Sequence, residues 1–328
     1  MKTTNKNLFG VGSLVLGILI FSLQDIAVKG MGSSYPVLEI VIFRTMVAMP
    51  ATLFFFRMEG GKGLPITKQH KLEFVRGLFY FLSYTTYFMG LAALPLAEVA
   101  AIKFSTPLMI TVLSVILLKE KVSLKHWIAL IVGFIGVMII IRPGSASFNL
   151  GSIFILLNVL FYVFAVMVTR RLQTTDSSAT MSYYGSLVYA VIAVVLAPIV
   201  IAVGPMPNAS PSIVFLFHAW SMPTLLDLLI MFGLGLVWAG GMYFMARAYS
   251  LALASVIAPF EYISLPISVM WGFLIWNQFP PLANGIGASI TLVSSLYTLY
   301  LGKKERSKNG ATSIENEIDS GTYEIVDP

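Results

Sequence analysis

Long uninterrupted apolar runs are the feature of this sequence that most restricts its fold. Each run is close to the roughly 20 residues that a helix needs to cross a bilayer core about 30 Å thick. The ten runs cover residues 8–28, 36–56, 74–92, 96–118, 124–141, 150–169, 179–203, 225–248, 254–276 and 281–301. They are continuous and do not alternate with a period of two, which favours helices over the strands of a membrane barrel. The sequence therefore predicts an all-α integral membrane protein with ten transmembrane helices.

Charged residues are scarce and cysteine is absent. Charged residues make up 11% of the chain and the mean hydropathy is +0.85, whereas a soluble protein is about 25% charged. The surplus apolar surface must face lipid. Without cysteine there are no disulfides and no thiolate chemistry. The three histidines lie in loops or at the ends of runs, with no second metal ligand at a suitable spacing. We therefore expect no metal, no cofactor and no enzymatic activity.

The positive charges are distributed very unevenly between the two sides of the predicted bundle. With the N-terminus in the cytoplasm, 17 of the 21 Lys and Arg residues lie on the cytoplasmic side and two, Lys29 and Arg142, lie on the outer side. Cytoplasmic loops are enriched in Lys and Arg. The distribution predicts a multi-pass protein of a bacterial-type cytoplasmic (inner) membrane with both termini in the cytoplasm. The net charge of +6 then reflects topology, and nucleic-acid binding is not expected.

Residues 93–144 and 252–303 are two versions of one pattern. Each begins with Ala-Leu, continues through an apolar span with an acidic residue near a proline, and ends, after a short turn, in a glycine-bearing span. Ten spans divide into five and five, and because five is odd, the second unit enters the membrane from the opposite side. We expect two inverted five-helix repeats, residues 1–145 and 146–304, followed by a disordered cytoplasmic tail, residues 305–328. Inverted repeats that exchange conformations provide alternating access, which predicts a secondary transporter.

Several short motifs occur in a fixed order along both halves. They are FR at 43–44, RG at 76–77, AALPLAEVAA at 92–101, Pro107, KEKV at 119–122, RPG at 142–144 and ASVIAPFEY at 254–262. In this order they resemble the EamA family of the drug/metabolite transporter superfamily over about residues 8–303. The resemblance implies a ten-helix secondary transporter. The APFEY segment is most similar to members associated with the uptake of S-adenosylmethionine or riboflavin. One difference is that Asn277-Gln278 replaces the Gly-Glu pair that the family often has at the end of span nine.

Six ionisable residues fall inside the predicted spans: Asp25, Glu39, Arg44, Glu98, Lys103 and Glu261. A charge at mid-span costs about 2.5–3.5 kcal/mol, so such residues usually face a cavity or a partner. Ion pairing between helices is one interpretation, and solvation of the carboxylates near the outer ends is another. The third interpretation is a substrate-binding or coupling site near the midplane. Four acids against two bases suit a cationic or zwitterionic substrate, or a proton-coupled step.

Tyrosines accompany these charges. Tyr80, Tyr84 and Tyr87 are spaced i, i+4 and i+7 on one helical face, and Tyr262 follows Glu261. A tyrosine wall beside carboxylates can hold a planar or cationic ligand by stacking and cation–π contacts. Packing between helices is the alternative interpretation of the same pattern.

Three prolines interrupt the predicted spans. Pro107, Pro259 and Pro266 each remove a backbone hydrogen bond, which frees a carbonyl for a ligand or allows the helix to bend during gating. A fixed kink that neighbouring helices satisfy is the alternative. Together the sequence predicts a transporter of a small organic metabolite, with membrane lipid around it and protons as candidate coupling ions. The competing hypothesis is a non-transporting membrane receptor or assembly subunit.

Overall fold

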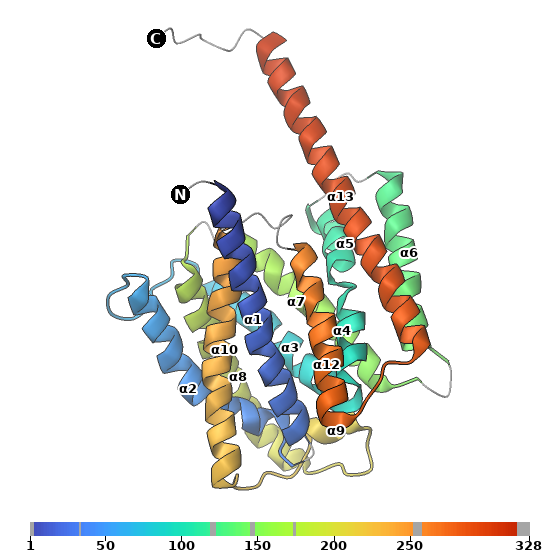
Figure 1. The fold of residues 1–328 in the computed structure, drawn as a ribbon. Coiled ribbons are helices and arrows are strands. Elements are labelled where there is room, and N and C mark those ends of the chain that lie inside the picture. The colour runs from blue at the N-terminus through green and yellow to red at the C-terminus, as the bar shows by residue number, and fades with distance from the viewer. Residues whose placement is uncertain are drawn as a thin grey trace.

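The protein is described by a computed structural model that covers residues 3–32, 34–118, 123–144, 148–172, 175–251 and 258–319. The secondary structure of these residues is helical throughout, with no strand among them. The helices form a bundle, and most of them run along its long axis (Figure 1). The predicted all-α class is confirmed for this part of the chain.

The first half of the chain follows the predicted apolar runs closely. Its helices are α1 (Thr3–Met31), α2 (Val37–Met58), α3 (His70–Ala93), α4 (Leu96–Lys103), α5 (Thr106–Leu118) and α6 (Leu124–Ile141). The run at 96–118 is therefore not one helix. It is divided into α4 and α5 at Phe104-Ser105.

The second half also follows the predicted runs. Its helices are α7 (Leu150–Leu172), α8 (Ser178–Val203), the short α9 (Pro211–Leu216), α10 (Leu225–Leu251), the 3-10 helix η1 (Ala258–Ile263), α12 (Ser264–Trp276) and α13 (Leu282–Asp319). The run at 254–276 is thus irregular as well, because its first described turns are 3-10 and α helix starts only at Ser264.

Length and composition identify the membrane-crossing helices. Within the described residues, seven segments are long and apolar enough to cross a membrane: Leu8–Met31, Val37–Met58, Leu96–Leu113, Leu124–Ile141, Leu150–Thr169, Ser178–Val203 and Leu225–Met245. Phe260–Trp276 is a shorter apolar helix. The chain is a multi-pass helical membrane protein, while the count of ten spans and the inverted repeat stay predictions.

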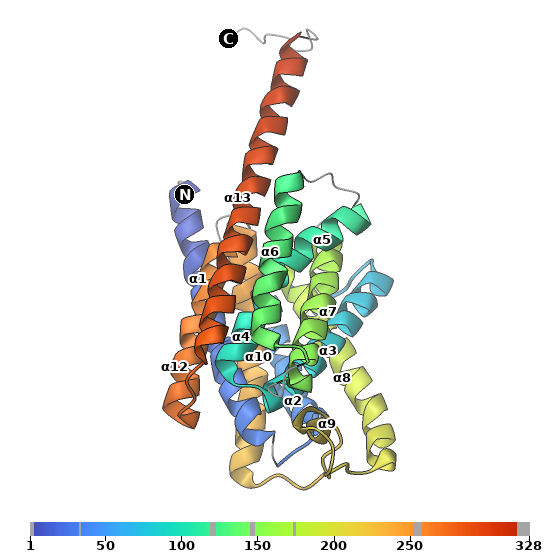
Figure 2. The same ribbon diagram turned by 90° about the vertical axis from the view of Figure 1, so that its right-hand side faces the viewer.

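The two ends of the bundle differ. The N-terminus of α1 and the C-terminus of α13 lie at one end, here called the terminal end, and α9 lies at the other, the α9 end (Figures 1 and 2). The predicted tail begins at residue 305, but α13 continues as a helix to Asp319 and projects beyond its neighbours. Extending a helix that packing has already nucleated needs no new nucleus, which explains why polar residues can remain helical here. Residues 320–328 lie outside the described residues.

Small residues bring particular helices close together. α3 packs along α7, α1 along α10, α6 along α13 and α2 along α10. A Cβ atom added to Gly136 on α6 would lie 2.7 Å from the carbonyl oxygen of Gly287 on α13, and one added to Gly287 would lie 2.6 Å from that of Gly136. In lipid the hydrophobic effect does not drive helices together, so their association depends on close packing. Small residues such as these glycines let the helix backbones approach closely.

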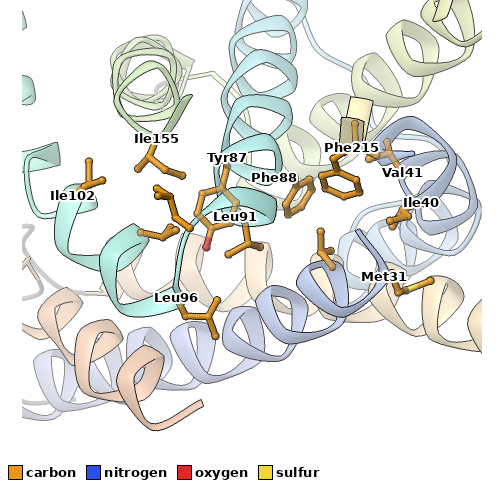
Figure 3. Close-up of a cluster of buried hydrophobic side chains, with 14 of the residues drawn as sticks. Met31, Ile40, Val41, Tyr87, Phe88, Leu91, Leu96, Ile102, Ile155 and Phe215 are labelled. Carbon is orange, nitrogen blue, oxygen red and sulfur yellow. The ribbon is translucent and has the colours of Figure 1, made fainter. Parts of the chain in front are cut away.

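The largest hydrophobic cluster seals the α9 end. It joins α1, α2, α3, α4, α6, α7, α8, α9, α10 and α13. Figure 3 shows Met31, Phe88, Leu91, Leu96 and Phe215 among its buried side chains. Toward the terminal end the core divides in two. One small cluster lies between α1 and α10, around Leu14 and Ala248, and another between α5 and α7. The bundle is therefore well packed at the α9 end and divided at the terminal end.

Candidate functional site

A cavity of about 170 Å³ lies at the middle of the bundle, where the divided part meets the sealed part. Its walls come from α1, α3, α4, α5, α7, α10, η1 and α12. Seven of the residues predicted from the sequence line it: Asp25, Tyr84, Tyr87, Lys103, Pro107, Glu261 and Tyr262. These residues come from four separate parts of the chain, so the fold brings them together.

Three ionisable side chains face this cavity: Asp25 on α1, Lys103 at the last turn of α4, and Glu261 in η1. The Tyr87 side chain lies beside the Asp25 carboxylate. The Lys103 ammonium lies 4.6 Å from the centroid of the Tyr87 ring, a cation–π distance. Lys103 is close enough to attract Asp25 electrostatically, yet the described residues hold no direct ion pair between them. Asp25 and Lys103 are therefore close together without forming an ion pair, which leaves both charged groups available to a ligand.

The break between α4 and α5 positions Lys103. The Ser105 hydroxyl donates to the carbonyl oxygen of Ile102 at 2.7 Å, and the Thr106 hydroxyl donates to that of Lys103 at 2.6 Å. The Ile102 carbonyl also accepts the Ser105 backbone N–H at 3.0 Å, so hydroxyl and backbone donors together satisfy the carbonyls at the break. Pro107 follows in the first turn of α5, where its missing N–H costs little.

The second irregular span has the same layout. η1 ends at Ile263, and Pro266 lies in the first turn of α12. Pro259 falls within η1. Two of the three predicted helix-breaking prolines, Pro107 and Pro266, therefore each lie at the start of a helix that follows a break or an irregular turn.

Arg44 lies behind the cavity wall and not in it. Its side chain is 1% exposed. The guanidinium carbon is 4.4 Å from the ring centroid of Trp238, 5.1 Å from that of Tyr189 and 5.7 Å from that of Phe88. Nη1 donates a hydrogen bond of 3.2 Å to Oε1 of Gln24. Aromatic faces therefore take the place of the carboxylate that ion pairing would have required.

Three other predicted residues also lie away from the cavity. Glu39 is buried at the start of α2, near the α9 end. Glu98 Oε2 accepts a 3.3 Å hydrogen bond from Asn284, whose own side-chain oxygen accepts one of 2.9 Å from Arg142. Tyr80 packs under Arg76, with 4.9 Å between the guanidinium carbon and the ring centroid. Their place in a binding site remains a prediction that this geometry does not favour.

Several neutral polar residues of the cavity were not predicted from the sequence. Gln24, Ser83 and Asn158 line it together with a further tyrosine, Tyr162. The site predicted from the sequence comprised only charged residues, prolines and tyrosines. The available signal was the isolated carboxamide within an apolar run, at Gln24 in the first run and at Asn158 in the sixth, because an unpaired amide is costly in lipid.

Lys29 connects three elements of the bundle on the side of the α9 end. Its ammonium donates to the carbonyl oxygens of Leu91 at 2.9 Å and Leu94 at 2.5 Å, and it lies 5.7 Å from the centroid of a Trp276 ring. One side chain thus joins α1, the turn between α3 and α4, and the end of α12. The side chain is half-buried, and we expect this connection to help close the cavity toward the α9 end.

We expect Lys29→Met to loosen this closure, because the substituted side chain cannot donate to either carbonyl. The chain has no cysteine, so a single cysteine placed at Ser264 in the cavity wall reports access. Impermeant thiol reagent added from the α9 end should label this cysteine several-fold faster in the Lys29→Met protein. Lys29→Arg keeps the donors and should label like the parent. Equal labelling of all three proteins would contradict the role of Lys29.

Comparisons with known proteins agree on the class of molecule. Residues 8–142 match the EamA-like transporter family. The S-adenosylmethionine uptake transporter of Rickettsia bellii is 27% identical over 91% of this chain and 96% of its own length. The riboflavin transporter of Vibrio cholerae is 30% identical over 65% of each chain. The pseudopaline exporter of Pseudomonas aeruginosa is 25% identical over 90% of this chain and 97% of its own.

A solved structure supports the fold. A protein crystal structure aligns with a TM-score of 0.60 and 16% identity over 90% of this chain and 98% of its own chain. This likeness concerns the arrangement of helices alone. The resemblance predicted from the motifs is confirmed, because residues 8–142 match the model of the EamA-like transporter family and the relatives named above are similar over both halves.

Proposed function

We propose that this protein is a secondary transporter that moves a small organic metabolite across the cytoplasmic membrane by alternating access. The observation that carries the proposal is the convergence of Asp25, Lys103 and Glu261 on one cavity. Two of these charges lie at irregular stretches of helix, in the fourth and ninth predicted spans. Discontinuous helices at matching places in two halves are the usual location of a transporter's binding site.

The packing pattern supports the inverted repeat. If the five predicted spans of the first half are exchanged with those of the second, α1 becomes α7, α3 becomes α10 and α2 becomes α8. The contact of α1 with α10 then becomes that of α7 with α3, and the contact of α2 with α10 becomes that of α8 with α3; both members of each pair occur. The contacts of α6 with α13 and α2 with α8 map onto themselves. A pseudo-two-fold relation would produce this correspondence.

The packing also suggests which state of the cycle is present. The α9 end is sealed by the main hydrophobic cluster and by Lys29, and the terminal end is divided into two clusters. We infer that the cavity communicates with the terminal end. With the termini in the cytoplasm, as the positive charges indicate, this is the inward-facing state. Exchange of the two repeat conformations would open the α9 end instead.

The charges suggest the kind of substrate. Asp25 and Glu261 can neutralise a cationic group, and Lys103 can pair with a carboxylate. The rings of Tyr84, Tyr87 and Tyr262 offer stacking surfaces beside them. A metabolite with a zwitterionic part and a planar or cationic part fits this set. S-adenosylmethionine is the first candidate, because the relative from Rickettsia bellii that bears this name aligns over 96% of its length, and riboflavin is the second. Either carboxylate could carry a coupling proton.

The test is uptake of S-adenosylmethionine and riboflavin into proteoliposomes. We expect the wild-type protein to transport one of them, and Glu261→Gln and Lys103→Ala each to lower the rate at least about tenfold, the effect of about 1.4 kcal/mol of lost interaction. Glu59→Gln, an exposed acid after α2 and outside the cavity, is the matched control and should transport normally. If both cavity variants insert and transport like the wild type, the site is assigned wrongly. If the wild type moves neither compound, these substrates are wrong.

A further inference from the structure

Two carboxamide side chains in the cavity wall are each oriented by a hydrogen-bond partner outside or beside the cavity. The two partners orient the amides in opposite senses. Gln24 on α1 and Asn158 on α7 both line the cavity and are almost fully buried, with 1% and 6% of their surface exposed. A carboxamide carries a donor and an acceptor on one planar group, so whatever fixes one side of it determines what the other side presents.

Arg44 fixes the orientation of Gln24. A guanidinium can only donate hydrogen bonds, so the amide must turn its oxygen toward Arg44. The observed bond, Nη1 to Oε1 at 3.2 Å, follows this rule. Arg44 itself is immobilised by the ring faces around it, the nearest being Trp238 at 4.4 Å. The Nε2 group of Gln24 is therefore directed away from Arg44, and its side chain meets the cavity as a donor.

Ser83 fixes the orientation of Asn158 in the opposite sense. The Asn158 side-chain Nδ2 donates to the backbone carbonyl oxygen of Ser83 at 2.9 Å and to its hydroxyl at 2.8 Å. A backbone carbonyl can only accept, so the amino group must face Ser83. Both hydrogens of the amino group are used, and the carbonyl oxygen of the amide remains for the other side. Asn158 therefore meets the cavity as an acceptor.

From this arrangement we propose that the cavity selects ligands by a fixed hydrogen-bond polarity, with Arg44 as a positioning residue that acts through Gln24. The inference rests on the proposed transport function. A ligand must bring an acceptor to the α1 wall and a donor to the α7 wall. A carboxamide, or the edge of a nitrogen heterocycle that carries an imine nitrogen beside an amino group, provides both. The charged residues of the cavity hold the ionic part of the same ligand.

The positioning of Gln24 also gives a role to Arg44, a buried arginine that has no carboxylate partner among the described residues. A methionine or leucine would pack among Trp238, Tyr189 and Phe88 without burying a charge. Neither side chain would prevent the Gln24 amide from rotating, so the donor would be presented only part of the time. The buried charge thus has a consequence for the ligand that packing alone does not provide.

The test is a double-mutant cycle on Arg44 and Gln24, with S-adenosylmethionine and riboflavin as the uptake probes. Arg44→Met should raise the KM of uptake about tenfold, the usual scale for one hydrogen bond, with a smaller effect on the maximal rate. Arg44→Lys keeps a donor and should restore the KM to within about threefold. In a Gln24→Leu background, Arg44→Met should raise the KM by less than about twofold.

Arg76→Met is the matched structural control. Arg76 is equally buried, at 3% exposure, but it bonds to Thr169 and the Met181 carbonyl and does not line the cavity. Its effect should be unchanged by Gln24→Leu. If Arg44→Met costs as much in the Gln24→Leu background as alone, the positioning role is overturned.

A ligand-free measurement separates this inference from the proposed function. The melting temperature of the purified, ligand-free protein is measured for the same single and double variants. The changes caused by Arg44→Met and Gln24→Leu should be non-additive, whereas those caused by Arg76→Met and Gln24→Leu should be additive. If the wild type transports neither probe but the changes in melting temperature are non-additive, the proposed substrates are wrong and the positioning of the Gln24 amide by Arg44 is supported. Additive melting temperatures overturn the fixed amide whatever is transported.

Discussion

Replacing Asp25 by asparagine should lower transport about 100-fold or more while leaving the protein folded. Asp25 is the carboxylate that a cationic group would meet in the cavity, beside Lys103 and Tyr87. Two unit charges 4 Å apart interact by about 4 kcal/mol at the effective dielectric constant of a protein site. Losing about 2.8 kcal/mol, roughly 70% of that energy, corresponds to a factor of about 100. Uptake into proteoliposomes and ligand-induced shifts in melting temperature measure it.

Glu98→Gln is the matched control for this experiment. The sequence alone does not distinguish Asp25 from Glu98 as a site residue, since both lie near the predicted outer ends of their spans. The structure separates them, because Glu98 accepts a hydrogen bond from Asn284, outside the cavity. Glutamine can accept the same bond, so transport should change by less than about threefold. Equal losses in Asp25→Asn and Glu98→Gln would contradict the assignment of the cavity.

These two carboxylates show what a sequence can and cannot specify in such a protein. Long apolar runs and the positions of charges within them follow from the sequence, because a bilayer restricts a chain to few solutions. The direction in which each charge faces depends on contacts between helices far apart in the chain. Asp25 meets residues of α3 and α4, whereas Glu39 is buried at the α9 end. No local pattern distinguishes the two.

The tyrosine face of α3 illustrates the same limit at shorter range. Helical periodicity places Tyr80, Tyr84 and Tyr87 on one side, as predicted, but one side of a long helix crosses more than one environment. Tyr84 and Tyr87 reach the cavity, while Tyr80 lies a turn closer to the terminal end and packs under Arg76. The packing interpretation therefore describes Tyr80, and the stacking interpretation stays a prediction for Tyr84 and Tyr87.

The helix breaks were easier to anticipate than the amides. Pro107 and Pro266 mark the beginnings of α5 and α12, because proline restricts the backbone whatever surrounds it. Gln24 and Asn158 have no such intrinsic signature. Their importance arises from the groups behind them, Arg44 and Ser83, which are distant in sequence. Neutral polar residues in apolar runs are thus as informative as charges, provided that the packing is known.

The closest approach of α2 and α10 gives the largest expected effect on stability. A Cβ atom added at Gly235 would lie 2.5 Å from the carbonyl oxygen of Arg44 and 2.9 Å from the amide nitrogen of Ala48, both backbone atoms of α2. No rotamer change can relieve such a contact, so the two helices must separate. Gly235→Ala should destabilise the protein by about 1–3 kcal/mol, the usual cost of overpacking, and lower its melting temperature by several degrees.

Gly233 provides the control on the same helix, two residues away. A Cβ atom added there meets nothing within 4 Å, and alanine forms helix better than glycine by about 1 kcal/mol. Gly233→Ala should therefore leave the melting temperature unchanged or raise it. Gly235→Ala should in addition impair transport, because separating α2 from α10 moves Arg44 away from Trp238 and releases Gln24. Equal melting temperatures for the two variants would show that α2 and α10 are not packed this closely in the membrane.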